Sequence, residues 1–394
     1  FPFRGHTIQA LRIIENLNKT GKYNILVDLG QEYDDYLPPG VEKHHCLYGF
    51  RSKKYQNNYS KDTLINYGEG ILSTLEGYRK WYSKGEFSPD LICFDSLAFW
   101  GKALADENNI PSIALHTIQP FDAEAFNKDG YKFLQPYTKV FSSEIEFRRI
   151  IHIYSKIVIG KYHLQSDFSF ADVLSAKGDY NLVLVPDYLC KYKNALNGNN
   201  MIYNPIVRDC LSGMEKSNIK SIAKEKIIYI STGSIINRKS FLIKCIDQCL
   251  NASDFEIYVS AGDFAKELKK RYKNQRQIHI YCFAPQVTVL RKASLFITHG
   301  GMNSICESIY YETPMIVIPF INDEYLNAKM VEESGIGLML NEKTFEKNLS
   351  ESIKTILNDR SMHANISYAS KKMKSIDTIS YAQDIFNNLV GKTV

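Results

Sequence analysis

The chain has 394 residues, of which 44% are hydrophobic and 23% are charged, and its net charge is +5. This length exceeds one ordinary core, so we expect two domains, and the apolar content excludes a disordered protein. The positive charge occurs in short clusters such as residues 269–271, without the basic stripe that is typical of nucleic-acid binding. Such a charge is compatible with weak attraction to phosphorylated ligands or to an anionic membrane surface.

The cysteines indicate a reducing compartment. All eight are scattered singly, and Cys245 and Cys249, four residues apart, match neither a zinc site nor a redox pair. No run approaches the ~20 apolar residues of a membrane span, and no signal peptide is recognisable. We therefore expect a cytoplasmic protein without a transmembrane segment. Gly5 lies close to the start of the sequence, and we expect it at a turn. Such a glycine turn normally follows a strand, so we expect that a short strand precedes this sequence.

Short apolar runs alternate with helical stretches along the chain. The strand-like runs are about five residues long and bounded by Gly, Pro, Asn or Asp. In the first half they are residues 24–29, 91–94, 112–115 and 181–185, with amphipathic helices at 8–17 and 99–107. In the second half they are residues 226–230, 255–259, 277–281, 295–298 and 315–318, with helices at 239–250, 303–310, 325–333 and from about 344 onward. This alternation predicts parallel sheets with helices on both faces.

The polar segment 203–223 predicts a domain boundary. We therefore expect an α/β protein of two tandem doubly wound, Rossmann-like domains facing a cleft, with domains at residues 1–208 and 209–375. Ligands of such sheets bind at the carboxyl ends of the strands, so the cleft is the expected site. Two aromatic-rich segments, 48–84 and 118–170, interrupt the alternation, and either an acceptor pocket or plain surface helices would explain them.

The densest signal lies around residues 295–307. A predicted strand ends in His299, Gly300 and Gly301, and a predicted helix opens at Asn303 and Ser304. The glycines let the backbone approach a ligand, and the helix N-terminus offers N–H groups and a favourable dipole to a phosphate. Any one of these residues is equally explained by a helix cap or a turn. The array as a whole favours a phosphate site.

The segment from Phe283 to residue 328 resembles the donor-binding signature of nucleotide-sugar glycosyltransferases of the macrolide and plant secondary-metabolite type. Members of this family have the two-domain fold called GT-B. The resemblance implies that Phe283 stacks on the nucleobase, that Gln286 hydrogen-bonds it and that Glu307 binds the ribose. It assigns the diphosphate to His299, Gly300, Gly301, Asn303 and Ser304. It also implies that residues 376–394, with a last helix ending near residue 390, cross back onto the N-terminal domain.

Two further donor elements follow from the resemblance. Ser231, Gly233 and Ser234 resemble a Ser-x-Gly-Ser/Thr loop that touches the diphosphate. Asp323 and Glu324 occupy the pair that contacts the sugar hydroxyls, which is usually Asp-Gln in the family. An ionised Glu only accepts hydrogen bonds whereas Gln also donates, so UDP-glucose is only the default donor.

The start of the chain resembles the family's Gly-His turn, in which the His is the catalytic base. His6 would take the acceptor proton, although Gln9 stands where the family usually has Pro. Asp95 follows the predicted strand 91–94 and would orient the His, as in the His–Asp half of a hydrolase triad. A turn or cap role would also explain Asp95. His116, after the next strand, is a weaker alternative base.

The sequence therefore predicts an inverting, metal-independent glycosyltransferase. It would move a sugar from a nucleoside diphosphate sugar to a hydroxyl of a small, largely apolar acceptor such as a polyketide, macrolide or phenol, without a cofactor. No Asp-x-Asp metal motif occurs, so His299, the serines and the helix dipole would stabilise the leaving group. A nucleotide-sugar epimerase of the same fold and a non-catalytic partner protein stay open, as do a monomer and a homodimer.

Overall fold

The computed structural model divides the chain into two compact units. The N-terminal unit comprises Phe1–Ile206 and Asp377–Val394, and the C-terminal unit comprises Val207–Ile376. The structure describes residues 4–45, 61–86, 88–126, 128, 145–146, 148–149, 152–153, 156, 170–196, 201–203, 226–233, 238–252, 255–321 and 323–390. Ser234, most of the predicted boundary 203–223 and large parts of both aromatic-rich segments lie outside these residues.

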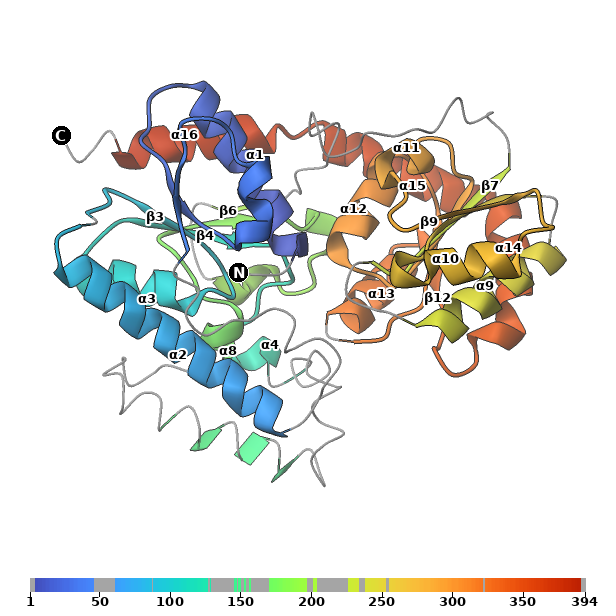
Figure 1. Ribbon diagram of the computed structural model, residues 1–394, viewed down its shortest axis with the longest axis horizontal. Helices are drawn as coiled ribbons and strands as arrows, with labels where there is room; N and C mark the ends of the chain where they lie inside the picture. Colours follow the sequence, from blue (N-terminus) through green and yellow to red (C-terminus); the bar gives the residue numbers. More distant parts are fainter. Residues whose placement is uncertain are drawn as a thin grey trace. The chain divides into compact units, whose positions relative to one another are not determined.

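The N-terminal unit contains a four-stranded parallel sheet (Figure 1). Its strand order is β3 (Ile92–Asp95), β4 (Ser112–His116), β5 (Tyr180–Val183), β6 (Met201–Tyr203). A separate parallel pair joins β1 (Leu26–Asp28) to β2 (Glu42–His44). The helices with it are α1 (Arg4–Lys19), α2 (Lys61–Ser83), α3 (Phe99–Asn108), α4 (Ala123–Ala125), α8 (Phe170–Leu174) and α16 (Thr378–Val390).

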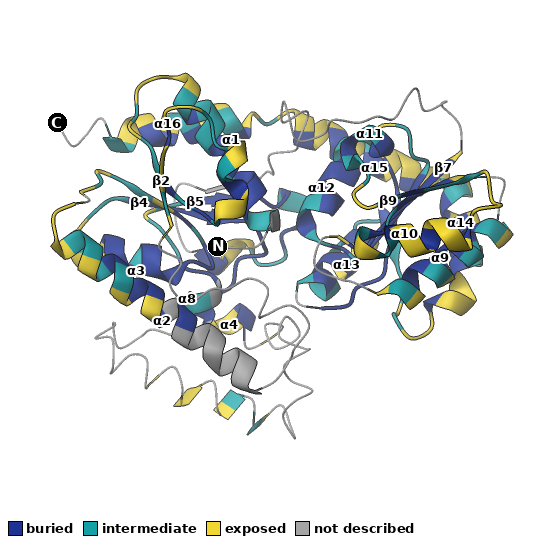
Figure 2. Cartoon of the chain, viewed as in Figure 1, coloured by how far each residue is buried: buried dark blue, intermediate teal, exposed yellow. Residues whose placement is uncertain are grey.

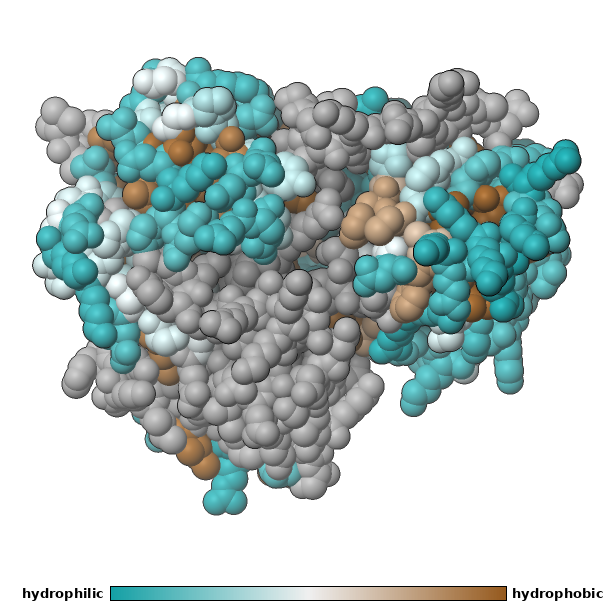
Figure 3. Space-filling model, viewed as in Figure 1, coloured by the Kyte–Doolittle hydropathy of each residue, from teal (hydrophilic) through white to brown (hydrophobic). Residues whose placement is uncertain are grey.

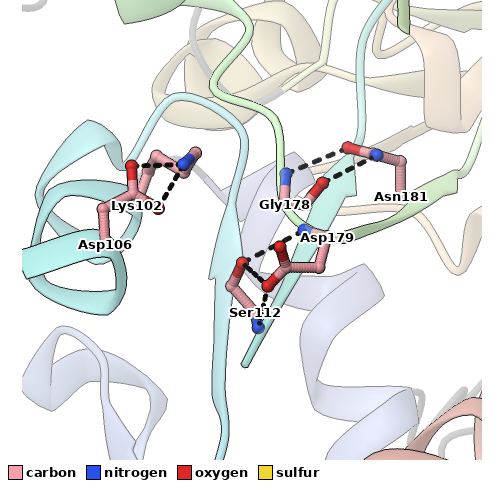
Figure 4. A network of polar contacts seen from close by, with 6 residues as sticks. All are labelled: Lys102, Asp106, Ser112, Gly178, Asp179 and Asn181. Carbon is pink, nitrogen blue, oxygen red and sulfur yellow. Dashed lines mark hydrogen bonds and ion pairs between the residues drawn. The ribbon is translucent and has the colours of Figure 1, made fainter. Parts of the chain in front are cut away.

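Side chains fix the register where β4 and β5 begin. The Asp179 carboxylate accepts hydrogen bonds from the Ser112 backbone N–H and hydroxyl, both at 2.8 Å, just before β5 (Figure 4). Asn181 closes the same turn, because its amide bonds both the N–H and the carbonyl of Gly178. Fixing the amino ends of these strands also fixes which residues emerge at their carboxyl ends, where ligands of such sheets bind.

The C-terminal helix completes the core of the N-terminal unit. Ala382, Ile385 and Phe386 of α16 pack with Ile13 and Leu17 of α1 and with buried residues of β4 and β5. The spacing 382, 385, 386 places these side chains on one face of the helix. Tyr23 adds an edge-to-face contact with Phe386 at 6.4 Å between ring centroids, and its hydroxyl donates to Asn387 at 2.6 Å. The helix that carries His6 is thus supported by the last helix of the chain.

The C-terminal unit contains a six-stranded parallel sheet. Its order is β12 (Gly337–Met339), β11 (Met315–Val317), β10 (Leu295–Thr298), β7 (Ile227–Ser231), β8 (Glu256–Ser260), β9 (Ile278–Tyr281). The helices are α9 (Lys239–Ala252), α10 (Ala265–Arg271), α11 (Gln286–Leu290), α12 (Met302–Tyr310), α13 (Glu324–Glu333), α14 (Phe345–Asn358) and α15 (Arg360–Lys374). The strand order reverses between β7 and β10, which is the point where open α/β sheets bind ligands.

Burial explains why these runs form strands. Every residue of β7, β10 and β11 is buried, as expected for the centre of a parallel sheet covered on both faces (Figure 2). The outer helix α14 buries one face, on which Phe345, Leu349 and Ile353 point inward. Figure 3 shows a mainly hydrophilic surface over α10. None of the helices in the described part of the chain has the length and apolar character needed to cross a bilayer.

The predicted α/β fold with two parallel sheets is confirmed. The nine predicted strands are present, with ends that differ by at most two residues. The prediction missed β2, β6 and β12, which have three residues each and lie at sheet edges. Edge strands are often short, and they are covered on fewer sides than central strands. The strand β2 therefore carries the polar residues Glu42, Lys43 and His44 and lacks the apolar run that marked the other strands.

The α16 packing gives the first prediction. Phe386→Ala should lower the free energy of unfolding of the N-terminal unit by about 3 kcal/mol, because it leaves a cavity in this core and removes the ring contact with Tyr23. Urea unfolding followed by tryptophan fluorescence measures this, because Trp81 and Trp100 are the only tryptophans and both lie in this unit. The exposed neighbour variant Asn388→Ala should unfold like the parent. Equal midpoints for all three proteins would show that α16 does not support the core.

Candidate active site

A histidine and a carboxylate meet at the carboxyl end of β3. His6 lies in the first turn of α1, and Asp95 is the last residue of β3. The His6 Nδ1 lies 2.8 Å from the Asp95 Oδ2, and the two side chains are only 12% and 9% exposed. An ionised carboxylate only accepts, so Nδ1 carries the proton and the lone pair of the neutral ring is on Nε2. The sequence-predicted pair is therefore brought together in the geometry of a general base and its orienting group.

Thr117 joins this pair. Its Oγ1 lies 2.6 Å from the His6 Nδ1 and 3.3 Å from the Asp95 Oδ2. Sequence analysis missed this residue. One signal was present in the sequence: Thr117 closely follows the predicted strand 112–115, as Asp95 follows the predicted strand 91–94. The structure pairs these strands in parallel, so both residues emerge at the same edge.

The Asp95 carboxylate is held in its ionised form. Burial alone would raise its pKa, but the charge and hydrogen bond of His6 and the Leu97 N–H, which donates to Oδ1 at 3.0 Å, lower the pKa to about 2. A carboxylate that stays charged keeps the imidazole oriented and stabilises the imidazolium that forms when His6 accepts a proton.

His116 is not an alternative base, and that prediction is wrong. Its side chain is fully buried, and its Nε2 lies 3.0 Å from the Asn181 Oδ1. Burial lowers its pKa to about 4. A ring enclosed in the protein cannot reach an acceptor hydroxyl, so His116 is a core histidine.

The second cluster lies where the strand order of the C-terminal sheet reverses. Ser231 ends β7 opposite Thr298 of β10, so the loops that follow these two strands are neighbours. Gly300 has φ +96° and Gly233 has φ +75°, which are left-handed conformations. A Cβ added to Gly233 or Gly301 would lie 2.6 Å from the His299 ring. The imidazole therefore occupies space that two missing side chains leave.

The helix after this corner begins without a side-chain cap. Gly301 is the N-cap of α12, and Asn303 and Ser304 lie in its first turn. A helix start with glycine at the cap presents backbone N–H groups and a positive dipole end to an anion. Burial lowers the pKa of His299 to about 4, although a hydrogen bond with the Ser231 backbone acts in the opposite direction. Burial therefore favours the neutral His299 ring, which has a single N–H to donate.

The predicted base- and ribose-binding residues are bonded to one another. The Gln286 Nε2 donates to the Glu307 Oε2 at 2.6 Å and to the Ser304 Oγ at 3.2 Å. Its Oε1 accepts from the Tyr229 hydroxyl at 3.2 Å. Tyr229 lies in the apolar run of β7, where the sequence predicted only a core side chain, and its role was missed. The contact of Gln286 with a nucleobase stays a prediction.

Phe283 is suited to stacking. Its side chain is 62% exposed, which is unusual for a phenylalanine, and it lies between β9 and α11, three residues before Gln286. An exposed aromatic face beside polar groups is a common platform for a nucleobase.

The Asp323–Glu324 pair is tied to the glycine corner. The buried Asn327 donates through its Nδ2 to the Asp323 Oδ2 at 2.8 Å and to the Gly300 carbonyl at 3.0 Å. The Glu324 Oε2 accepts from the backbone N–H groups of Phe320 and Ile321. The described donor-site candidates thus lie at or after the carboxyl ends of β7, β9, β10 and β11, which belong to one sheet. Among the described residues, no group of three or more His, Cys, Asp or Glu side chains could hold a metal ion.

Comparison with known proteins identifies relatives of this chain. Residues 228–380 match the glycosyltransferase family 28 C-terminal domain. The uncharacterized UDP-glucosyltransferase YojK of Bacillus subtilis (strain 168) is 26% identical over 92% of this chain and 89% of its own length. The chain is a nucleotide-sugar glycosyltransferase of the GT-B fold. The predicted family and enzyme class of this glycosyltransferase are thereby confirmed.

Two solved structures match the fold of the glycosyltransferase over nearly its whole length. The glycotransferase of kitacinnamycin gives a TM-score of 0.82 at 20% identity and covers 99% of this chain and 97% of its own. UDP-glucose: anthocyanidin 3-O-glucosyltransferase in complex with UDP gives a TM-score of 0.68 at 14% identity, with coverages of 98% and 96%.

The lowered pKa of Asp95 gives the second prediction. Asp95→Asn should lower the free energy of unfolding of the glycosyltransferase at pH 7 by about 2 kcal/mol, because the folded state favours the ionised carboxylate. This advantage of the parent is present above the ordinary pKa of 3.8 and is lost as the pH falls through the folded value of about 2. Urea unfolding between pH 7 and pH 2 measures the difference, with the exposed Asp90→Asn as control. A difference that stays constant down to pH 2 would contradict this account.

Proposed function

We propose that this glycosyltransferase transfers a sugar, with UDP-glucose as the default donor, to a hydroxyl of a small apolar acceptor such as a polyketide, macrolide or phenol. The observation that carries the proposal is the hydrogen bond between His6 and Asp95 at the carboxyl end of β3. A buried carboxylate that fixes the tautomer of a histidine is what deprotonation of an alcohol requires.

In the proposed step the His6 Nε2 takes the proton of the acceptor hydroxyl as that oxygen attacks the anomeric carbon. The bond between the anomeric carbon and the diphosphate oxygen breaks, and the nucleoside diphosphate leaves with the electron pair. Asp95 stabilises the imidazolium, and Thr117 helps to hold the ring through its 2.6 Å contact with Nδ1. A single displacement inverts the anomeric configuration.

On the donor side, we assign the diphosphate to the glycine corner and the start of α12. His299 and the backbone N–H groups there would stabilise the charge that develops on the leaving group. Phe283 would stack on the base, and Glu307, held by Gln286, would accept from the ribose hydroxyls. The names of the matched proteins support this class of donor, because YojK is a UDP-glucosyltransferase and the anthocyanidin enzyme is seen with UDP.

The acceptor class is supported by the names of the matched structures. The two matched structures are the glycotransferase of kitacinnamycin and an anthocyanidin 3-O-glucosyltransferase. Such acceptors combine aromatic or apolar surface with a hydroxyl, and aromatic side chains bury such ligands well. We therefore propose acceptors of the same chemical kind for this chain.

The third prediction tests the base. His6→Ala should lower the rate of sugar transfer by about 10²–10⁴-fold, because general-base assistance is lost, while the affinity for UDP stays unchanged. Mass spectrometry of products from UDP-glucose and a panel of phenols and macrolides measures transfer, and calorimetry measures UDP binding. His363→Ala, an exposed histidine on α15, is the matched control. A His6→Ala enzyme as fast as the parent would refute the assignment. Conversion of UDP-glucose into an epimeric nucleotide sugar without any acceptor would favour the epimerase class.

The fourth prediction concerns metal ions. The proposed site stabilises the leaving diphosphate with an imidazole and a helix start, so chelation should leave transfer unchanged. Rates measured with excess EDTA and after addition of Mg²⁺ or Mn²⁺ should agree within about twofold, well below the effect that metal catalysis normally contributes. A loss of activity that Mg²⁺ restores would show that a metal takes part.

A further inference from the structure

A tyrosine in the centre of the C-terminal sheet has a rigid, buried ring. Tyr229 of β7 is only 1% exposed and stands opposite Phe296 of β10 in the register of the two strands. The two rings stack, with 4.9 Å between their centroids and 10° between their planes. A phenylalanine would fill the same space, so packing alone does not explain the hydroxyl group of Tyr229.

The Tyr229 hydroxyl holds a flexible side chain. It donates to the Gln286 Oε1 at 3.2 Å. Gln286 is half-buried and is the first residue of α11. A buried hydroxyl is costly unless it is hydrogen-bonded, and a long side chain such as glutamine loses rotamer freedom when it is fixed. The stacked ring therefore gives one end of the Gln286 amide a fixed point of attachment.

The other end of the amide holds two residues of α12. The Gln286 Nε2 donates to the Glu307 Oε2 at 2.6 Å and to the Ser304 Oγ at 3.2 Å. A carboxylate only accepts hydrogen bonds, so the NH₂ group faces Glu307 and the Oε1 is left for Tyr229. Because the Ser304 oxygen accepts from the amide, its own O–H can donate to a phosphate. One glutamine amide thus joins a core tyrosine to both polar side chains.

We infer that Tyr229 is a positioning residue for the nucleotide: through Gln286 it holds Glu307 and Ser304 where they meet the ribose and the diphosphate. This inference rests on the proposed function of the donor site, which assigns those two residues to those groups. Groups that are already held in the binding geometry lose less freedom when the ligand binds, so they bind it more tightly. The hydroxyl of a core residue thereby contributes to the preference for a ribonucleotide over a 2′-deoxyribonucleotide.

The neighbouring strand offers a matched control. Tyr258 of β8 stands opposite Tyr229 in the register and is also buried, at 7% exposure. Its ring stacks on His279 and on Tyr281. Gln286 accepts from Tyr229, so Tyr258→Phe removes a second buried hydroxyl from the same sheet without touching that bond.

The fifth prediction compares Tyr229→Phe, which keeps the ring and removes the hydroxyl, with Tyr258→Phe. Calorimetry gives the ratio of the dissociation constants of 2′-deoxy-UDP and UDP. The parent should show a ratio of at least about tenfold, because a polar site that loses a substrate hydroxyl discriminates strongly. The ratio should fall at least about threefold in Tyr229→Phe and stay within about twofold of the parent in Tyr258→Phe. A merely structural role of Tyr229 would weaken the binding of both nucleotides alike and leave the ratio unchanged.

A double variant tests the path through Gln286. Gln286→Ala should lower the ratio at least as much as Tyr229→Phe does. Adding Tyr229→Phe to Gln286→Ala should then change the ratio by less than about twofold, because two residues that act through one path are not additive.

A third readout needs no ligand. Exchange of the Gln286 side-chain NH₂ protons with water can be followed by nitrogen–proton NMR, with the signals assigned by their loss in Gln286→Ala. The exchange should be at least about threefold faster in Tyr229→Phe than in the parent and in Tyr258→Phe, because the amide loses its fixed point.

Two results would overturn the inference: an unchanged ratio in Tyr229→Phe, or a large further fall in the double variant, which would show that Tyr229 acts by another route. If Tyr229→Phe does not fold, Gln286→Ala decides, since an unchanged ratio refutes the inference and a fall of at least about threefold supports it. A parent that binds neither nucleotide, or binds both alike, would refute the proposed donor site instead. The NH₂ exchange would then still decide whether Tyr229 holds Gln286.

Discussion

The proposed donor site depends on one steric constraint at the carboxyl end of β10. The His299 ring occupies the space where side chains at positions 233 and 301 would be, since a Cβ at either position would come within 2.6 Å of it. Glycine at both positions therefore lets the two loops at the strand reversal close around an imidazole. The same absence of side chains exposes the start of α12 to a ligand. Gly300 adds a carbonyl that Asn327 binds, which extends the corner to Asp323 and Glu324.

In the N-terminal unit too, the candidate catalytic side chains lie at the carboxyl ends of neighbouring parallel strands. Asp95 and Thr117 emerge at one edge because β3 and β4 run side by side in register. His6 comes from α1, and α1 is held against the sheet by the core that it shares with α16. The orientation of the imidazole thus depends on residues from both ends of the chain, and the ionised Asp95 converts that orientation into a defined tautomer.

The sequence was most informative where burial is complete on both faces. The runs that became β7, β10 and β11 were found because every residue in them is apolar or small. His6 and Asp95 were found through a family resemblance, since a lone Gly-His or an Asp after a strand has many explanations. Thr117 and Tyr229 were missed because their side-chain partners lie 22 to 111 residues away in the sequence. The sequence also could not predict which groups the Glu324 carboxylate binds. A carboxylate beside a binding loop can contact a ligand, or it can accept hydrogen bonds from the backbone of its own segment.

The most direct test of the central claim is hydrogen exchange of the protein with and without saturating UDP, combined with calorimetry on a Gly301→Val variant. The account predicts that UDP protects the amides at the start of α12, from residue 302 to 305, and those near residues 283–286. It also predicts that Gly301→Val weakens UDP binding by at least about tenfold, because the new side chain displaces His299 and blocks the helix start. Protection confined to other segments, or a Gly301→Val protein that binds UDP like the parent, would contradict it.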